Sequence, residues 1–303
     1  MSVINTSSFA KALFPGINQW YGRGYDEFPV EYTGLFDTDV SHRRYEEDVG
    51  VSSFGLGVVK AEGEGVSYDT EKQGFTTRYG HIVIGLGFII TREMYEDDLY
   101  DQAGKNKARG LAFSMRQTKE IICANIYNRA FSSLFLGSDG VALCSTAHVN
   151  IGSATWSNKL LIDADLSEGS LEQGCIDLAK FTNDRGLRIA VMPECLVVPP
   201  DYMFEAERIL KSPARVGTAN NDLNALKEMG KFPQGIKMNH YLTDNDAWFI
   251  RTNVPDAMRY FQRRPMEFTI DYDFATENAK YKALERYSAG WSDPRGVYGS
   301  AGA

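Results

Sequence analysis

The best candidate in this sequence for a catalytic nucleophile and its general base is a thiol and an imidazole four residues apart. Cys144 and His148 enclose the segment Cys-Ser-Thr-Ala-His, and on a helix that spacing would place both side chains on one face. The surrounding residues are typical of a loop, and no group is recognisable that would orient the imidazole. We therefore favour polar contacts that anchor a loop, and keep as an alternative a cytoplasmic α+β enzyme with an unrecognised site near Cys144 and His148.

Other patterns that carry chemistry are missing. The sequence contains no GxGxxG, Walker-type, GxSxG, HExxH or CxxC motif. The acidic run from Glu93 to Asp101 lacks the alternating oxygens of an EF-hand loop, so we expect it to begin a solvated helix. Arg263 and Arg264 form a basic doublet, for which a surface salt bridge is favoured over phosphate binding. The sequence thus predicts no catalytic residue, no cofactor and no metal.

Composition restricts the class of protein. The chain has 303 residues, 43% of them apolar and 24% charged, which suits one large or two modest globular domains. Its net charge of −8 argues against a protein that reads nucleic acid sequence. The longest apolar run, residues 82–90, is far shorter than the roughly 20 residues that span a bilayer. We expect no membrane contact, no secretory signal, and four reduced cysteines of a cytoplasmic product.

The N-terminal segment is rich in aromatic residues. Six fall between Trp20 and Phe36, where the average content of 12% would give about two, and glycines and prolines interrupt any helix. Such a segment suits an extended arm that lies on another subunit, and deletion of residues 1–40 is then expected to leave soluble protein that assembles poorly. A loop folded onto its own domain is the alternative.

Residues 51–90 have the composition of β structure, with Val, Ile, Tyr and Thr between glycines. We predict a long hairpin with strands at about 54–70 and 75–90, turning at Gly63 and Gly65. An isolated hairpin is marginally stable in water, so it is expected to lie against other subunits.

A long helix is predicted after the hairpin, capped by Thr91 and covering about 92–131. Its apolar face is Leu111, Met115, Ile122 and Ile126. An α/β section follows, with a capping box at Asp165 and Glu168, a buried strand over 187–198 and short helices and strands to residue 252. The alternation in 266–274 predicts a half-buried strand, and 277–290 fits either a helix or a strand.

This order of parts resembles the major capsid protein of tailed phages, with the Hong Kong 97-like fold. The segments 60–68, 85–98 and 145–148 are similar to passages of Mu-like and related phage head proteins. The resemblance implies an α+β fold with an extended N-arm, a β-hairpin called the E-loop, a P-domain with a long spine helix, and an A-domain. The corresponding ranges are 1–50 for the arm, 51–91 for the E-loop, 92–160 for the P-domain, 161–261 for the A-domain, and 262–303 for the return strands and C-terminus.

The resemblance also implies a structural function without enzymatic activity. Subunits would form hexamers and pentamers of an icosahedral shell around double-stranded DNA, which they would contact weakly and without sequence specificity. Scaffolding, portal and decoration proteins would be separate partners, and the protein would be made in the host cytoplasm and reside in the virion capsid. A cellular nanocompartment shell protein is a further alternative. Some relatives crosslink through a hairpin lysine, but salt bridges are favoured here for Lys60 and Lys72. The candidates for contacts between subunits are Trp20, Tyr21, Tyr25, Phe28, Lys60, Glu62 and Lys72.

Overall fold

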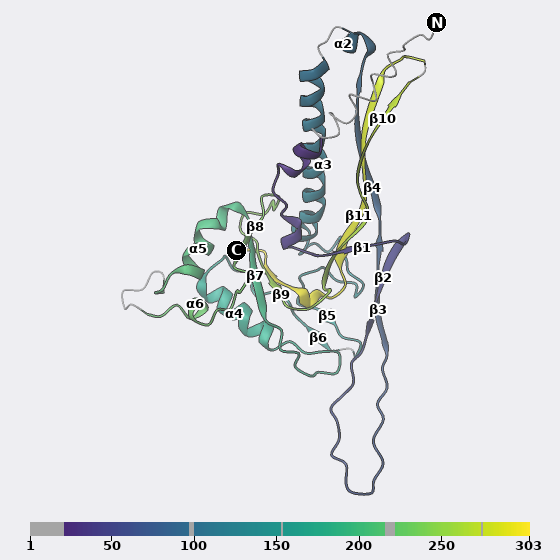
Figure 1. Cartoon of the computed structure of the whole chain (residues 1–303). Helices are drawn as coiled ribbons and strands as arrows, with labels where there is room; N and C mark the ends of the chain where they lie inside the picture. Colours follow the sequence, from purple (N-terminus) through teal and green to yellow (C-terminus); the bar gives the residue numbers. More distant parts are fainter. Residues whose placement is uncertain (1–20, 97–99, 153, 216–221, 274) are drawn as a thin grey trace.

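The described residues form two four-stranded sheets, two two-stranded sheets, a long helix and an outlying loop (Figure 1). The computed structural model describes residues 21–96, 100–152, 154–215, 222–273 and 275–303, without the side chains of 95–103. Within these ranges no helix is both long enough and apolar enough to cross a membrane.

The first sheet is elongated and has the strand order β1-β10-β11-β4. Its strands are β1 (Asp37–Val40), β10 (Met258–Tyr272), β11 (Ala279–Trp291) and β4 (Ile82–Ile90). All neighbours are antiparallel except β1, which runs parallel to β10. The strand predicted at 266–274 is confirmed as the end of the longer β10, and the ambiguous segment after it forms a strand.

The predicted long helix corresponds to two helices of the described chain. It comprises α2 (Arg92–Glu96) and α3 (Tyr100–Asn128), and α3 runs beside the first sheet (Figure 1). The Thr91 hydroxyl accepts a hydrogen bond from the Met94 amide at 3.4 Å, as expected for a cap. The 29 residues of α3 span roughly 43 Å at 1.5 Å per residue. The predicted apolar face is confirmed, because Leu111 and Met115 are buried against the sheet.

The predicted hairpin exists with different bounds. Its strands are β2 (Tyr45–Val51) and β3 (Gln73–Gly80), and residues 52–72 between them form an extended loop without a strand ladder. The strand expected at 54–70 is therefore wrong. The strand expected at 75–90 is two strands, because β4 leaves the hairpin after His81 to pair with β11. We call residues 52–72 the hairpin loop.

The second sheet has the order β12-β9-β7-β8. Its strands are β12 (Val297–Ser300), β9 (Trp248–Thr252), β7 (Pro193–Val198) and β8 (Ile236–Met238). The helices of this part are α4 (Glu168–Ala179), α5 (Met203–Lys211) and α6 (Ala225–Glu228). The remaining short elements are β5 (His148–Val149), β6 (Thr155–Trp156), and the 3-10 turns η1 (Tyr32–Gly34), η2 (Pro200–Tyr202) and η3 (Pro294–Gly296).

Details of this part correct the sequence analysis. Helix α4 is capped by Ser167 with Ser170 in a reciprocal capping box, two residues later than the predicted pair of Asp165 and Glu168. The buried strand, predicted over 187–198, begins only at Pro193, and its register with β9 shifts between Pro193 and Cys195. Because β12 pairs with β9, the C-terminal strand belongs to the second sheet, so the predicted boundary between 261 and 262 does not separate the two sheets.

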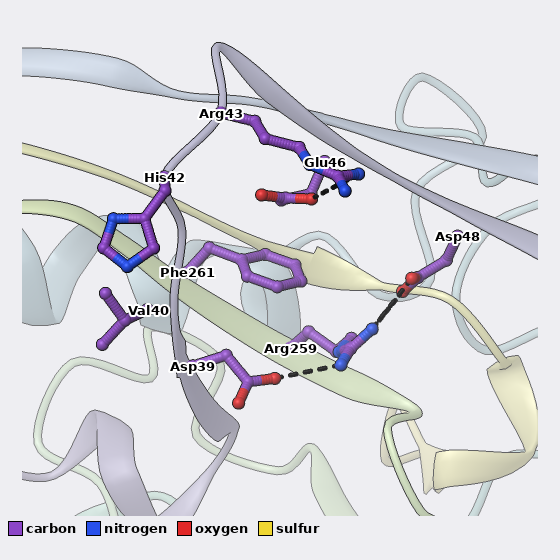
Figure 2. A pocket seen from close by; sticks show the side chains of 8 residues that line it. All are labelled: Asp39, Val40, His42, Arg43, Glu46, Asp48, Arg259 and Phe261. Atoms are coloured by element: carbon purple, nitrogen blue, oxygen red, sulfur yellow. Dashed lines mark hydrogen bonds and ion pairs between the residues drawn. The ribbon is translucent and has the colours of Figure 1, made fainter.

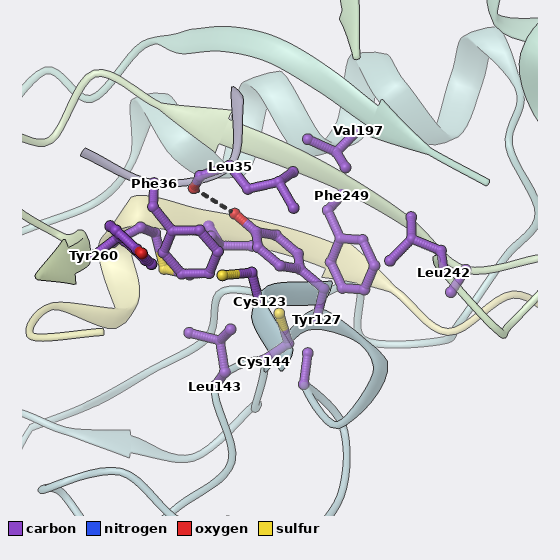
Figure 3. Packing of buried hydrophobic residues seen from close by; sticks show 14 of the residues in the cluster. Leu35, Phe36, Cys123, Tyr127, Leu143, Cys144, Val197, Leu242, Phe249 and Tyr260 are labelled. Carbon is purple, nitrogen blue, oxygen red and sulfur yellow. Dashed lines mark hydrogen bonds between the residues drawn. The ribbon is translucent and has the colours of Figure 1, made fainter. Parts of the chain in front are cut away.

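One hydrophobic core joins both sheets to the helix (Figure 3). Cys123 and Tyr127 of α3 pack in it with Val197 and Phe249 of the second sheet. The Tyr127 hydroxyl donates a hydrogen bond to the Leu35 carbonyl at 3.1 Å. The N-terminal segment, the long helix and the second sheet are therefore fixed to one another by buried side chains.

Candidate assembly surfaces

The hairpin loop exposes apolar side chains that the rest of the described chain does not cover. Val59 is 96% exposed and Tyr68 is 95% exposed. The others that stand out in the same way are Phe54, Leu56, Val58 and Val66. Scattered exposed apolar residues are ordinary, but six within one extended loop form a surface that water solvates poorly.

The base of the hairpin loop is fixed, although its tip is not paired. The Asp69 carboxylate accepts a hydrogen bond from the Gly55 amide at 2.8 Å, across the loop. The Arg185 guanidinium donates to the Asp69 carboxylate at 3.1 Å, the Thr70 carbonyl at 2.6 Å and the Ser53 carbonyl at 3.1 Å. Hydrogen bonds from the Gly55 and Thr70 amides, with the charge of Arg185, lower the pKa of Asp69. The loop therefore leaves the body of the protein in a defined direction.

The three charged candidates of the hairpin loop lie on its exposed surface. Lys60, Glu62 and Lys72 are all exposed, and none makes an ion pair with a residue that the structure describes. Their contacts with neighbouring subunits stay a prediction. Gly63, between them, has φ of 82°, which confirms it as a turn position, whereas Gly65 has no such backbone requirement.

The aromatic candidates of the N-terminal segment are used mainly within the subunit. Tyr21 is completely buried and Tyr25 nearly so, against α3 and the first sheet, which corrects the expectation that they face a neighbour. Phe28 is half-buried on Phe113, with ring centroids 4.7 Å apart, and stays a candidate. Trp20 lies outside the described residues. Between residues 21 and 36 the chain folds onto its own domain, as the alternative held.

A buried ion pair holds this N-terminal segment to the helix and the sheet. The Lys119 ammonium of α3 donates to the Glu285 carboxylate of β11 at 2.7 Å and to the Tyr25 hydroxyl at 2.7 Å. The Tyr25 hydroxyl in turn donates to the same Glu285 oxygen at 2.8 Å. The side chains of Lys119 and Glu285 are 4% and 1% exposed. Three elements thus meet at one desolvated charge pair.

A second ionic contact fixes the base of the hairpin to the first sheet (Figure 2). The Arg259 guanidinium lies between Asp39 of β1 at 2.9 Å, Asp48 of β2 at 2.8 Å and Asp256 at 3.1 Å. An open pocket of about 360 Å³ beside it is lined also by His42, Arg43 and Glu46. Because Arg259 is already paired with carboxylates from three segments, this pocket is a structural junction.

The thiol and imidazole that opened the enzyme alternative are both structural. His148 is fully buried, its Nδ1 lies 2.5 Å from the Asp139 carboxylate, its Nε2 lies 3.0 Å from the Asn158 side-chain oxygen, and its ring stacks on Trp156. Burial raises the pKa of the Cys144 thiol strongly, so it stays protonated and a poor nucleophile. The described part of the chain holds no cluster of three or more His, Cys, Asp or Glu side chains that could bind a metal.

Sequence reasoning placed the turn at Gly63 correctly, but it predicted strand where the hairpin loop lies and named only charged residues of the loop as contact candidates. The exposed apolar residues of the hairpin loop are its more unusual feature. The pair Val58 and Val59, in a segment that has no partner strand, is the sequence signal that could have indicated them. Arg259 gave no local signal, since its three acids come from distant parts of the sequence.

A long helix beside an elongated sheet, a second sheet with its own helices, and a projecting hairpin loop together define the Hong Kong 97-like class of shell proteins. The model of one protein family, described as phage capsid protein, matches residues 76–300, roughly three quarters of the chain. The chain belongs to this phage capsid protein family, and it is a structural protein of the capsid shell. No curated protein sequence matches it.

Solved structures agree on the fold at low sequence identity. The mature capsid of bacteriophage PhiM1 is similar with a TM-score of 0.55 and 11% identity, covering 90% of this chain and 86% of that one. The procapsid of bacteriophage JBD30 is similar with a TM-score of 0.53 and 12% identity, covering 98% of this chain and 76% of that one. A virus-like particle from Pyrococcus furiosus is similar with a TM-score of 0.51 and 10% identity, covering 95% of this chain and 98% of that one. The tailed-phage resemblance and the fold class predicted from the sequence are thereby confirmed.

Proposed function

We propose that this capsid protein assembles as hexamers and pentamers that tile an icosahedral shell around double-stranded DNA. The observation that carries the proposal is the hairpin loop, whose apolar side chains are exposed in the single subunit although its base is fixed. Transfer of apolar surface out of water contributes about 25 cal/mol per Å². The loop therefore gains most of its burial from a neighbouring copy, with Lys60, Glu62 and Lys72 at the polar rim.

The charge of the subunit suits a container for nucleic acid. With a net charge of −8, the shell confines a polyanion without binding its phosphates tightly. We propose that the protein is made in the host cytoplasm, has no catalytic activity, and works with separate scaffolding, portal and decoration proteins. A cellular nanocompartment protein and an enzyme are not favoured, because the family match is to phage capsids.

The test changes the apolar character of the loop and nothing else. The double substitution Val58→Ser with Val59→Ser should leave the unfolding midpoint of the subunit unchanged, since both side chains are exposed, and should reduce the yield of shells at least tenfold in sedimentation and negative-stain microscopy. The matched control, Val58→Ile with Val59→Ile, keeps the surface apolar and should assemble normally. Normal shells from the serine variant would show that the loop makes no important contact.

A further inference from the structure

Three arginines converge on one small pocket in the first sheet, on the face that Leu284 and Val83 also line. The pocket has a volume of about 140 Å³, and Arg263, Arg264 and Arg286 are among the residues that line it. Arg264 and Arg286 are direct cross-strand partners. Like charges in that position repel each other, so a sheet without a compensating group is destabilised there.

The backbone is shaped to bring these side chains together. Consecutive residues of a regular strand point to opposite faces. In β10 the register with β11 shifts between Gln262 and Arg264 and again between Arg264 and Glu267, so the alternation is broken and Arg263 and Arg264 line the same pocket. The Gln262 side chain fixes this irregularity by donating to the Arg264 carbonyl at 2.8 Å.

Neither Arg263 nor Arg286 makes an ion pair with a carboxylate of the described residues. The Nε groups of Arg263 and Arg286 are buried and make no hydrogen bond to any described residue. Arg264 has one weak partner, Glu267 at 3.7 Å. Glu285 also lines the pocket, but one of its oxygens is bound by Lys119 and Tyr25, and the other makes no hydrogen bond within the described residues.

A neighbouring histidine reports the same positive field. His81 lies between the hydroxyls of Ser41 and Ser288, each 2.9 Å from one of its ring nitrogens. Burial lowers the pKa of His81, Arg286 and Arg263 lower it further, and Glu46 opposes them.

We propose that this pocket is an oxyanion site that takes one carboxylate or phosphate group between Arg263 and Arg286. The planar guanidinium fork matches both groups geometrically, and Arg263 and Arg286 bring it to the pocket from neighbouring strands. A volume of about 140 Å³ suits a single small anion. The site rests on one chain and does not depend on the proposed contact of the hairpin loop.

Calorimetric titration of the unassembled full-length subunit with inorganic phosphate, at constant ionic strength in chloride, tests the site. We expect saturable binding of one phosphate per chain, weakened at least about tenfold by Arg286→Gln and by Arg263→Gln. The control Arg188→Gln removes an exposed arginine elsewhere and should bind as the parent does. Arg286→Lys, which keeps the charge but loses the fork, should be intermediate and serves if the glutamine variant folds poorly. Absence of saturable binding, or equal binding by all variants, overturns the proposal.

A second arm identifies the source of the oxyanion. If a carboxylate side chain of a second copy fills the pocket, assembled shells should no longer bind phosphate although free subunits do. If a free anion is the ligand, shells and subunits should bind it equally. Either result supports the site, and phosphate binding by shells alone contradicts it.

Discussion

The buried pair of Lys119 and Glu285 gives the sharpest prediction for the stability of the subunit. Lys119→Met removes both 2.7 Å hydrogen bonds and leaves the Glu285 carboxylate buried with one partner, the Tyr25 hydroxyl. Removing one member of a desolvated pair costs about 3–5 kcal/mol, a large part of the stability of an ordinary domain. Adding Glu285→Gln replaces the stranded charge with a neutral amide, so the double variant should lose only about 1–2 kcal/mol.

Urea unfolding of the unassembled subunit, followed by far-ultraviolet circular dichroism at neutral pH, measures these differences. Lys60→Met is the control, because the same substitution in the exposed hairpin loop should change the free energy of unfolding by less than about 0.5 kcal/mol. Hydrogen exchange should also rise in residues 21–36 of the Lys119→Met variant, since Tyr25 loses its anchor. A loss below about 1 kcal/mol, or two single losses that simply add in the double variant, would refute the coupling.

Three more predictions follow from particular contacts. Deletion of residues 1–36 should unfold the subunit, because it removes four buried side chains that stabilise the fold by about 1.5–3 kcal/mol each. The measurement is the loss of the cooperative thermal transition. A stable truncated subunit would contradict the observed packing. Because the pKa of His81 is lowered from 6.5, the unfolded chain binds its proton more readily, so stability should fall as the pH drops through 6.5 toward the folded pKa. His81→Gln should flatten this part of the profile, and an unchanged slope would reject the assignment. Gly63→Val should introduce about 1–2 kcal/mol of local backbone strain, because Gly63 has φ of 82°, and should slow assembly as followed by light scattering. The control Gly65→Val should assemble at the normal rate in that assay.

Local patterns predicted the elements whose stability is local. The apolar face of α3 and the alternation at 266–274 each carried a periodicity, and both proved right. The order of these parts was enough to indicate the fold class.

What failed depended on partners distant in sequence. The segment 54–70 has strand composition but no strand to pair with, and β4 separates from β3 because β11 offers a longer partner. Tyr21 and Tyr25 looked like anchors for a neighbour, yet both pack in a hydrophobic cluster with α3 and the first sheet, where the Tyr25 hydroxyl also bonds to Glu285. The surface salt bridge predicted for the Arg263 and Arg264 doublet is present for Arg264, which pairs with Glu267, whereas the register shifts that bring the doublet beside Arg286 leave no mark on the sequence.

Strand β12 has a consequence for synthesis on the ribosome. Val297 closes the core shared by both sheets, and Tyr298, beside it, completes the core of the second sheet. Neither core can close until residues 297–300 have left the exit tunnel, long after the hairpin loop has emerged with its apolar side chains uncovered. A nascent chain therefore passes through a long interval in which it can aggregate with other chains but cannot yet fold. A chaperone that binds the chain during translation would act in that interval.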